Sequence, residues 1–327
     1  MRASSTAEVK STTGQLFKRH HAEPVLSPAD WPYEVNTVFN PGVATLADGS
    51  TLLLARVETR TGLSHLTAAR SRDGMTDWKV DSEPTLLPAP EHWPQEQWGV
   101  EDARITFIPE RNEYFICYTA YSRSGAALAT ATTRDFKNFK RLAVALPPDN
   151  KDAAVLPRRV NGRWVMFHRP LSEMSGDIWM CHSPDLEYWG DHRRVLQTRG
   201  RGFWDSKKVG LGPPLIDTDE GWIMIYHGAR ESARGAIYRV GMALLDRDQP
   251  HKVLRRSDHW VFGPETANDR SGDINNVVFP TGFTIDPEDD DVVRIYYGIA
   301  DTSIGLVTAR ISDMLEHLQR DDVMTST

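Results

Sequence analysis

The chain has 327 residues, of which 40% are hydrophobic and 25% are charged. These proportions are ordinary for a globular protein with a sizeable core, and the length suits one large domain or two domains of ordinary size. The formal net charge is −7. A net negative charge argues against nucleic acid or an anionic membrane as a partner, because both attract basic surfaces.

The cysteines and the N-terminal residues indicate the cellular compartment. Cys117 and Cys181 both lie in apolar runs, which is typical of buried thiols in a reducing compartment rather than of a disulfide framework. The first residues, Met1 to Glu8, contain no apolar signal core, and no apolar run reaches the length of a membrane span. We therefore expect a cytoplasmic protein.

Short apolar or alternating runs recur along the chain between clusters of Gly, Pro, Asp and Asn, and helical periodicity is scarce. The clearest runs are Thr51–Val57, Tyr114–Thr119, Trp164–His168, Trp222–Tyr226 and Val292–Tyr297. Many short strands separated by turn residues are typical of an all-β protein.

A weak repeat lies on top of this pattern. A strand ends at a small or hydroxyl residue, and an Asp follows in a turn, where its carboxylate can accept hydrogen bonds from its own backbone. The copies centre on Asp73, Asp135 and Asp185, with looser copies at Asp246 and Asp313. Their spacings of 62, 50, 61 and 67 residues suggest five similar units. We predict a single five-bladed β-propeller domain over residues 31–320. The alternative is a two-sheet sandwich with chance Asp turns.

The two ends of the chain lie outside the predicted propeller. Residues 1–30 are polar and irregular, and three interpretations stay open: a disordered lead, an extra strand that closes the ring, or an arm that packs in a homo-oligomer. Residues 311–319 can form a short helix, and residues 321–327 are expected to fray.

The stretch from Trp98 to Thr106 is the first candidate for chemistry. It sets Glu101 and Asp102 before Arg104 and a short apolar run. In a regular strand, Glu101 and Asp102 point to opposite faces, whereas Asp102 and Arg104 share one. A carboxylate beside a guanidinium is either a structural ion pair or a tuned catalytic acid, and the local sequence alone favours the ion pair.

Further charged residues follow predicted strands in successive blades. The carboxylates are Asp102 and Asp301, and the basic set is Lys151, Arg169, Lys208 and His227. Cations gathered at one face repel each other unless an anion joins them, and Arg and Lys are the usual phosphate partners. Taken singly, each has an ordinary interpretation, because a lone loop Lys is solvated and a lone His after a strand is a core residue.

At these residues the chain resembles the family-130 glycoside phosphorylases and hydrolases, the β-mannoside phosphorylase family, which has a five-bladed propeller fold. The resemblance runs from Phe39 to Asp301. It rests on Phe-Asn-Pro-Gly42, Ala-Arg-Ser-Arg-Asp-Gly74, Gly-Val-Glu-Asp-Ala-Arg104, Tyr-Thr-Ala-Tyr121, Asn-Lys-Asp152, His-Arg-Pro170, Lys-Val-Gly210 with Gly-Pro-Pro214, Tyr-His-Gly228 and Tyr-Tyr-Gly-Ile-Ala-Asp301.

The resemblance implies inverting phosphorolysis of β-mannosides to α-mannose 1-phosphate. Asp102 is then the general acid, which relays its proton through the mannosyl 3-hydroxyl to the glycosidic oxygen. The residues expected to bind the sugar are Asn40, Arg56, Arg104 and Asp301. The residues expected to bind phosphate are Lys151, Arg169, Lys208 and His227, together with Tyr226. A phosphate nucleophile needs positioned cations but no second carboxylate base.

Two other functions stay open. The first is a β-mannosidase that uses water, with Glu265 or Asp273 as the base. The second is a carbohydrate-binding propeller without chemistry, in which some of the ten tryptophans stack on sugars.

The sequence predicts no cofactor besides phosphate as co-substrate, and no metal site, because the histidines form no pairs at zinc-ligand spacing. It leaves open a 1,2 or 1,4 linkage and the acceptor sugar, which depend on loops such as Pro90–Gln97 and Arg230–Arg239.

Overall fold

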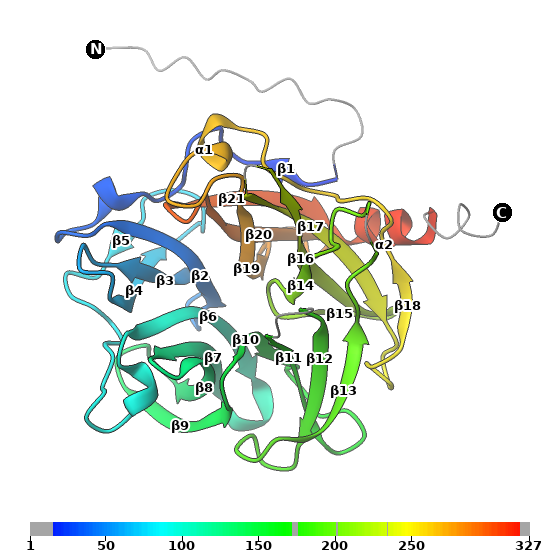
Figure 1. Ribbon diagram of the computed structural model, residues 1–327, viewed down its shortest axis with the longest axis horizontal. Helices are drawn as coiled ribbons and strands as arrows, with labels where there is room; N and C mark the ends of the chain where they lie inside the picture. Colours follow the sequence, from blue (N-terminus) through cyan, green and yellow to red (C-terminus); the bar gives the residue numbers. More distant parts are fainter. Residues whose placement is uncertain (1–15, 172–175, 201, 234, 321–327) are drawn as a thin grey trace.

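The computed structural model describes residues 16–171, 176–200, 202–233 and 235–320. In these residues the chain is all-β, as predicted, with short 3-10 turns and two helices. The strands form hydrogen-bonded sheets that are arranged around a common centre (Figure 1). Neither helix has the length and apolar composition that a membrane span requires.

Most of the strands follow each other as antiparallel meanders. The first sheet contains β2 (Thr37–Thr45), β3 (Thr51–Glu58), β4 (Ser64–Ser71), β5 (Lys79–Val80), β6 (Gly99–Ile108), β7 (Glu113–Ser122), β8 (Gly125–Thr133) and β9 (Phe139–Leu146). The second contains β10 (Asn150–Val155), β11 (Trp164–Pro170), β12 (Ile178–Ser183) and β13 (Gly190–Leu196). The third contains β14 (Lys208–Leu211), β15 (Ile216–Thr218), β16 (Gly221–Ser232), β17 (Gly235–Leu245) and β18 (Val253–Arg256).

The last sheet joins the two ends of the described chain. It contains β19 (Val278–Ile285), β20 (Val292–Ile299) and β21 (Ser303–Arg310), and β1 (Lys18–Arg19) pairs with β21 at its outer edge. Of the three interpretations of residues 1–30, β1 agrees with an extra strand. The helices are α1 (Ala267–Arg270) and α2 (Ile311–Arg320), and α2 confirms the predicted C-terminal helix. Residues 1–15 and the predicted frayed tail, 321–327, lie outside the described residues.

The eight-stranded sheet consists of two halves. Strands β2–β5 form one meander and β6–β9 form another, and the two are joined by a parallel bridge between Ser64 and Gly99. The five runs predicted from the sequence are β3, β7, β11, β16 and β20. Each is the second long strand of its meander and is buried on both faces, and this explains why these strands are the most apolar of the chain.

The core lies between neighbouring meanders. One hydrophobic cluster joins β2–β5 to β6–β9, and others join β6–β9 to β10–β13 and β10–β13 to β14–β18. Two more join β14–β18 to β19–β21 and β19–β21 to β2–β5. Each meander therefore packs against the one before it and the one after it. This packing places β2, β6, β10, β14 and β19 nearest the centre (Figure 1).

The predicted Asp turns are confirmed at four positions. In each turn a carboxylate oxygen of Asp73, Asp135, Asp185 or Asp246 accepts hydrogen bonds from the backbone N–H groups two and three residues later. The fifth copy was wrong, because Asp313 lies in the first turn of α2. A carboxylate is also favoured there by the helix dipole, so local sequence could not separate the two cases.

Candidate active site

The inner strands share a backbone irregularity that aims side chains at the centre. The pairing register shifts between Phe39 and Gly42 in β2, between Glu101 and Arg104 in β6, and between Lys151 and Ala154 in β10. Each shift contains one residue in the left-handed region: Asn40 (φ 45°), Asp102 (φ 50°) and Asp152 (φ 54°). Such bulges bend a strand and redirect a side chain, and they are common next to active sites.

The bulge in β6 overturns the predicted alternation around Asp102. Glu101 and Asp102 were expected to point to opposite faces, yet both contact the same guanidinium, that of Arg56. Arg56 Nη2 lies 3.0 Å from Glu101 Oε1, and Arg56 Nη1 lies 3.4 Å from Asp102 Oδ1. The expected pairing of the Asp102 carboxylate with Arg104 is replaced by a hydrogen bond from Arg104 Nη1 to the backbone carbonyl of Asp102 (2.8 Å).

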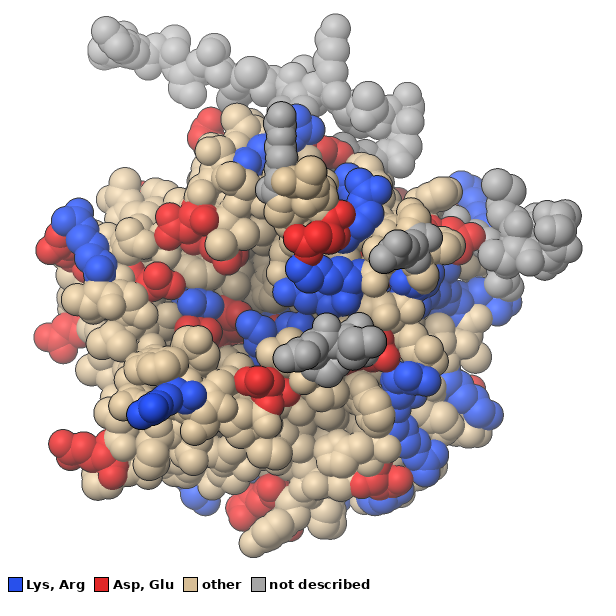
Figure 2. All heavy atoms as spheres, in the orientation of Figure 1, with Lys and Arg blue, Asp and Glu red and all other residues tan. Residues whose placement is uncertain are grey.

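A cavity of about 240 Å³ lies where these inner strands meet. It is lined by Asn40, Arg56, Asp102, Lys151, Arg169, Lys208, His227, Tyr238, Ile274, Val277, Phe279 and Asp301. Figure 2 shows a hollow near the middle of this face, with Lys and Arg atoms next to Asp and Glu atoms. The fold therefore brings together eight of the ten side chains that the sequence selected, from β2 to the turn after β20.

One wall of the cavity carries carboxylates and an amide. Asn40 Nδ2 donates to Asp102 Oδ1 (3.0 Å), and both side chains are buried. Asp301 follows β20 in a tight turn and has a left-handed backbone (φ 51°). Burial, together with the negative charge of Asp102, raises the pKa of Asp301 to about 6. A site that raises the pKa of a carboxyl in this way favours its protonated form, which can donate a hydrogen bond.

The other wall is built around the buried carboxylate of Asp152. Arg169 Nε donates to Asp152 Oδ2 (2.8 Å), Arg104 Nη2 lies 3.6 Å from Oδ1, and His227 Nε2 lies 3.5 Å from Oδ2. Burial alone would raise the pKa of Asp152, but the neighbouring charges, that of Arg169 above all, hold it well below its ordinary value. Asp152 is therefore a permanent anion that positions the basic side chains around it.

This basic wall has hydrogen-bonding capacity that the described protein atoms leave unused. Arg169 Nη1 and both ring nitrogens of His227 are buried and have no hydrogen-bond partner among the described residues. Burial lowers the pKa of His227 well below its ordinary value. Burial and the charge of Arg169 lower the pKa of Lys208 to about 8. A neutral imidazole offers one donor and one acceptor. Buried polar atoms without partners are costly, so this wall can receive a polar anion that accepts from Arg169.

Two predicted site residues lie elsewhere. Arg104, predicted to bind substrate, is 1% exposed and lies outside the cavity lining. Its guanidinium also donates to the carbonyls of Leu211 (3.2 Å) and Gly212 (3.1 Å), so it joins β6 to the end of β14 and the residue after it. In this position it supports Asp152 from behind instead of facing the cavity.

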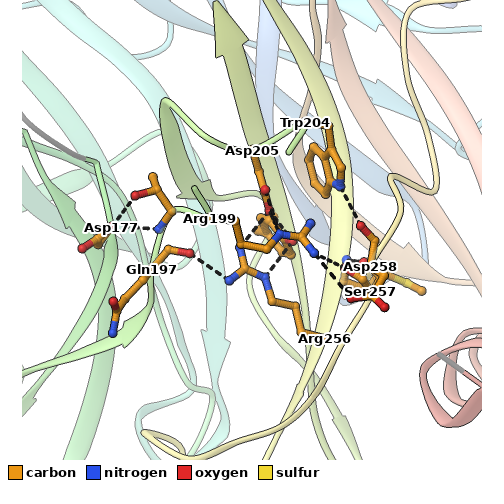
Figure 3. A network of polar contacts seen from close by, with 11 residues as sticks. Asp177, Gln197, Arg199, Trp204, Asp205, Arg256, Ser257 and Asp258 are labelled. Carbon is orange, nitrogen blue, oxygen red and sulfur yellow. Dashed lines mark hydrogen bonds and ion pairs between the residues drawn. The ribbon is translucent and has the colours of Figure 1, made fainter. Parts of the chain in front are cut away.

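Tyr226, predicted to bind phosphate, points away from His227 because neighbouring residues of β16 face opposite sides. Its ring stacks on Trp204, and its hydroxyl donates to Asp205 Oδ2 (3.1 Å). Asp205 also accepts from Arg199 (2.8 Å) and Arg256 (2.8 Å) in the buried network of Figure 3. Tyr226 is thus part of the packing between β16 and the segment before β14.

Sequence reasoning missed the aromatic side chains of the cavity. Tyr238 lies in β17, within the stretch 230–239 that was expected to be a loop, but this stretch forms the end of the long β16–β17 hairpin. The ammonium of Lys208 lies 4.8 Å from the centre of the Tyr238 ring. The Phe279 ring lies 4.4 Å from the His227 ring, centre to centre. Successive side chains of β17 and β19 point to alternate faces of the strand, and this alternation was the signal available in the sequence. It does not say which of the two faces lines the central cavity.

The groups required by the two alternative functions are placed away from the cavity. Glu265 lies 2.7 Å from Arg19 near α1, and Asp273 accepts from Asn36 (3.1 Å), and neither lines the cavity. No tryptophan is among the described residues that line it. One group of possible metal ligands in the described chain, His168, Cys181 and His192, also lies outside the cavity.

A larger cavity of about 840 Å³ lies at the opposite ends of the same strands, beside Val43, Ile105 and Phe283. Its described lining contains neither lysine nor histidine. The smaller cavity combines buried acids and unpaired cationic donors, so we consider it the better candidate despite its size.

Known proteins resemble this chain over most of its length. A family model described as beta-1,4-mannooligosaccharide phosphorylase matches residues 10–320. The Beta-1,2-mannobiose phosphorylase of Listeria innocua is 38% identical over 261 residues, which are 79% of this chain and 70% of that protein. The Beta-1,4-mannooligosaccharide phosphorylase of Ruminococcus albus is 33% identical over 309 residues, 92% of this chain and 90% of that protein.

The solved structure of the Listeria innocua Beta-1,2-mannobiose phosphorylase, in complex with beta-1,2-mannobiose, has the same fold. Its TM-score is 0.83 at 31% identity, with 93% of this chain and 99% of that chain covered. The family match and the similarity of two relatives extend over most of the chain. The chain therefore belongs to the family-130 glycoside enzymes, the family of the mannoside phosphorylases.

Proposed function

We propose that this enzyme carries out inverting phosphorolysis of β-mannosides, in which inorganic phosphate cleaves the glycosidic bond to give α-mannose 1-phosphate and a shortened acceptor. The linkage is β-1,2 or β-1,4, as in the relatives. A phosphate oxygen forms a bond to the anomeric carbon while the bond to the glycosidic oxygen breaks, and the acceptor leaves as an alcohol after it takes up one proton.

The proton comes from the acidic wall. Asp102 is the general acid and relays its proton through the 3-hydroxyl of the mannosyl unit to the leaving oxygen. Asn40 donates to Asp102 and fixes the direction of its carboxyl. Asn40, Arg56 and Asp301 hold the mannosyl hydroxyls, because together they offer both donors and acceptors. Holding the sugar this way converts binding energy into correct orientation for attack.

Phosphate binds on the opposite, basic wall, and one observation carries the proposal. Within the described part of the chain, Arg169 Nη1 and the His227 ring nitrogens are buried without hydrogen-bond partners, next to Lys208, in a protein of net charge −7. Lys151 lies on the same lining. Phosphate supplies the acceptor oxygens and negative charge that these groups lack. Because phosphate is itself the nucleophile, no carboxylate base is needed on this wall.

The geometry is less favourable for the two alternatives. A hydrolase needs a base that activates water, and Glu265 and Asp273, the candidates from the sequence, pair with Arg19 and Asn36 outside the cavity. The binding module expected from the sequence would stack sugars on tryptophans, but tryptophan is absent from the described lining. Neither offers a use for the unpaired donors of Arg169 and His227.

The arrangement of the meanders supports a finer description of the fold. We propose that residues 31–320 form one five-bladed propeller, whose blades begin with β2, β6, β10, β14 and β19. Five hydrophobic clusters, each between two successive meanders, support this arrangement. In such a fold the innermost strand of each blade contributes to one central site.

We further propose that the enzyme acts in the cytoplasm, where phosphate and reduced thiols are available.

The test is to incubate the enzyme with a panel of β-1,2- and β-1,4-mannosides, with and without phosphate. We expect α-mannose 1-phosphate, identified by phosphorus NMR, only when phosphate is present, and the preferred substrate identifies the linkage. Release of free mannose at the same rate without phosphate would establish hydrolysis. Binding of the sugars with no product under either condition would establish a non-catalytic module.

A further inference from the structure

Three potential metal ligands meet on one face of the sheet β10–β13, away from the cavity. They are His168 on β11, Cys181 on β12 and His192 on β13, and their ligand atoms all lie within 4.8 Å of one another. His168 Nε2 lies 3.1 Å from His192 Nδ1. His168 and Cys181 are buried, whereas His192 is exposed.

The pairing of the strands accounts for this meeting. His168 pairs with Trp179, and Met166 pairs with Cys181, so His168 and Cys181 are diagonal neighbours on one face of the β11–β12 ladder. The β12–β13 ladder shifts register between Met180 and His182. This bulge brings the outer strand, with His192, to the same face as the other two ligands.

A hydrogen bond to Asn150 fixes the direction of the His168 ring. His168 Nδ1 lies 3.0 Å from Asn150 Oδ1. A carboxamide oxygen can only accept, so Nδ1 carries the proton, and Nε2 presents its lone pair toward Cys181 and His192. Orientation of a ligating His by a hydrogen bond to its other nitrogen is a general feature of metal sites.

We propose that His168, Cys181 and His192 bind one zinc ion, with water as the fourth ligand. Ordinary Zn–N and Zn–S bonds place tetrahedral ligand atoms about 3.3 to 3.6 Å apart. Here the two nitrogens lie 3.1 Å apart, and all three ligand atoms lie within 4.8 Å of one another. Thiolate and imidazole together favour zinc over calcium or magnesium. On binding, the Cys181 thiol gives its proton to solvent and the sulfur bonds to the metal. The fourth position is open to water, because His192 is at the surface.

The zinc ion would join three successive strands of one sheet. It would hold the outer strand β13 to β11, where Arg169 directly follows His168. None of its three ligands lines the cavity. The role is therefore structural, and it does not depend on the proposed phosphorolysis. Local sequence does not predict this site, because the ligands lie 13 and 11 residues apart and the register of the ladders brings them together.

Cobalt substitution tests the site directly. The full chain is stripped with a chelator under reducing conditions and titrated with Co²⁺ while its absorption spectrum is recorded. We expect one Co²⁺ per chain, with a near-ultraviolet thiolate-to-cobalt band and the intense visible bands of tetrahedral cobalt. Zn²⁺ should displace the cobalt and raise the melting temperature of the stripped protein.

Matched variants identify the ligands. Cys181→Ser should abolish the thiolate band, whereas Cys117→Ser, at the other buried cysteine of the same hydrophobic cluster, should keep it. His192→Ala changes an exposed residue and should weaken cobalt binding at least about tenfold without unfolding the protein. The proposal is overturned if the wild-type protein gives no thiolate band, or if the band survives in Cys181→Ser or is unchanged in His192→Ala.

Discussion

At the scale of single residues, the site depends on side chains held by a left-handed backbone. Asn40, Asp102, Asp152 and Asp301 all have φ between 45° and 54°. Asn and Asp tolerate this region better than most residues, at a cost of about 1 kcal/mol or more each. Three of them sit at bulges in adjacent inner strands, and all four side chains act at the cavity or directly behind it. At these four positions the left-handed backbone aims a side chain at the site or at the groups behind it.

The role of Asp102 predicts a selective loss of catalysis. Asp102→Asn removes the proton but keeps the shape, so kcat should fall by about 10²- to 10⁴-fold. Phosphate binding, measured by calorimetry, should stay nearly unchanged, because phosphate contacts the opposite wall. Glu101→Gln is the matched control, since Glu101 contacts the same Arg56 and should cost far less in kcat. Equal losses in the two variants would contradict the assignment.

Arg169 should govern phosphate affinity. Arg169→Lys keeps a positive charge near Asp152 but removes the unpaired Nη1 donor. We expect the KM for phosphate to rise at least about tenfold with a smaller change in kcat at saturating phosphate. Arg169→Ala should show a larger rise, but it also leaves Asp152 with less compensation and should lower stability. Unaltered phosphate kinetics in both variants would rule out the proposed contact.

Lys208 should give the reaction an upper pH limit. Its pKa is lowered to about 8, so the side chain loses its proton as the pH rises through 8 and no longer attracts phosphate. We expect kcat/KM for phosphate to fall above pH 8, approaching tenfold per pH unit. Lys208→Arg keeps its charge throughout and should move this fall to higher pH. If kcat/KM for phosphate in Lys208→Arg still falls near pH 8, the fall belongs to the titration of another group.

At the scale of elements, β16 presents different chemistry on its two faces. His227 faces the cavity, and Tyr226 faces the network of Asp205, Arg199 and Arg256 (Figure 3). Gly228 allows the strand to lie close to Trp204 and Asp205, because a Cβ there would be 2.4 Å from the Asp205 Cβ. The network thus anchors the strand that carries His227 without touching the cavity.

Loss of this anchor should reduce stability more than it affects chemistry. Asp205 is fully buried, and Asp205→Ala leaves two largely buried guanidinium groups without their shared partner. We expect the free energy of unfolding, from urea titration, to fall by about 3 kcal/mol, with the KM for phosphate changed little. Asp219→Ala removes an exposed Asp–Arg pair and should have almost no effect on stability. Equal stability of both variants would contradict the anchor.

At the scale of the whole molecule, the N-terminal strand holds the last sheet. Arg19 on β1 donates to Glu265 (2.7 Å), Asp269 (2.7 Å) and the carbonyl of Gly263 (2.8 Å). Its guanidinium also lies 4.4 Å from the centre of the Phe262 ring. One side chain therefore ties the start of the described chain to the segment around α1, about 250 residues away.

This tie predicts a stability contribution far from the site. Arg19→Ala should lower the free energy of unfolding by about 2 to 4 kcal/mol, because Asp269 is buried and loses its cation. It should also speed proteolytic cleavage next to β1. Lys18→Ala, on the exposed side of the same strand, is the control and should change neither. A melting temperature equal to that of the wild type would show that β1 is dispensable.

The sequence by itself determined the local structure and the chemical types at the site. Alternation and turn residues identified the buried second strands, four of the Asp turns and the C-terminal helix, because these depend on neighbours along the chain. The family motifs also selected eight side chains that line the cavity. The meanders are similar units, so the ends of corresponding strands lie close together around the centre. Residues selected at those strand ends therefore meet in one cavity.

Only the tertiary structure decided which way individual side chains point. Bulges break the period of two, so Glu101 and Asp102 contact the same arginine instead of facing apart. Arg104 and Tyr226 bear the right chemistry but pack behind the cavity, while Tyr238 enters it from a stretch expected to be a loop. Contacts across sheets and the register of each ladder set these directions, and neither is written in the local sequence.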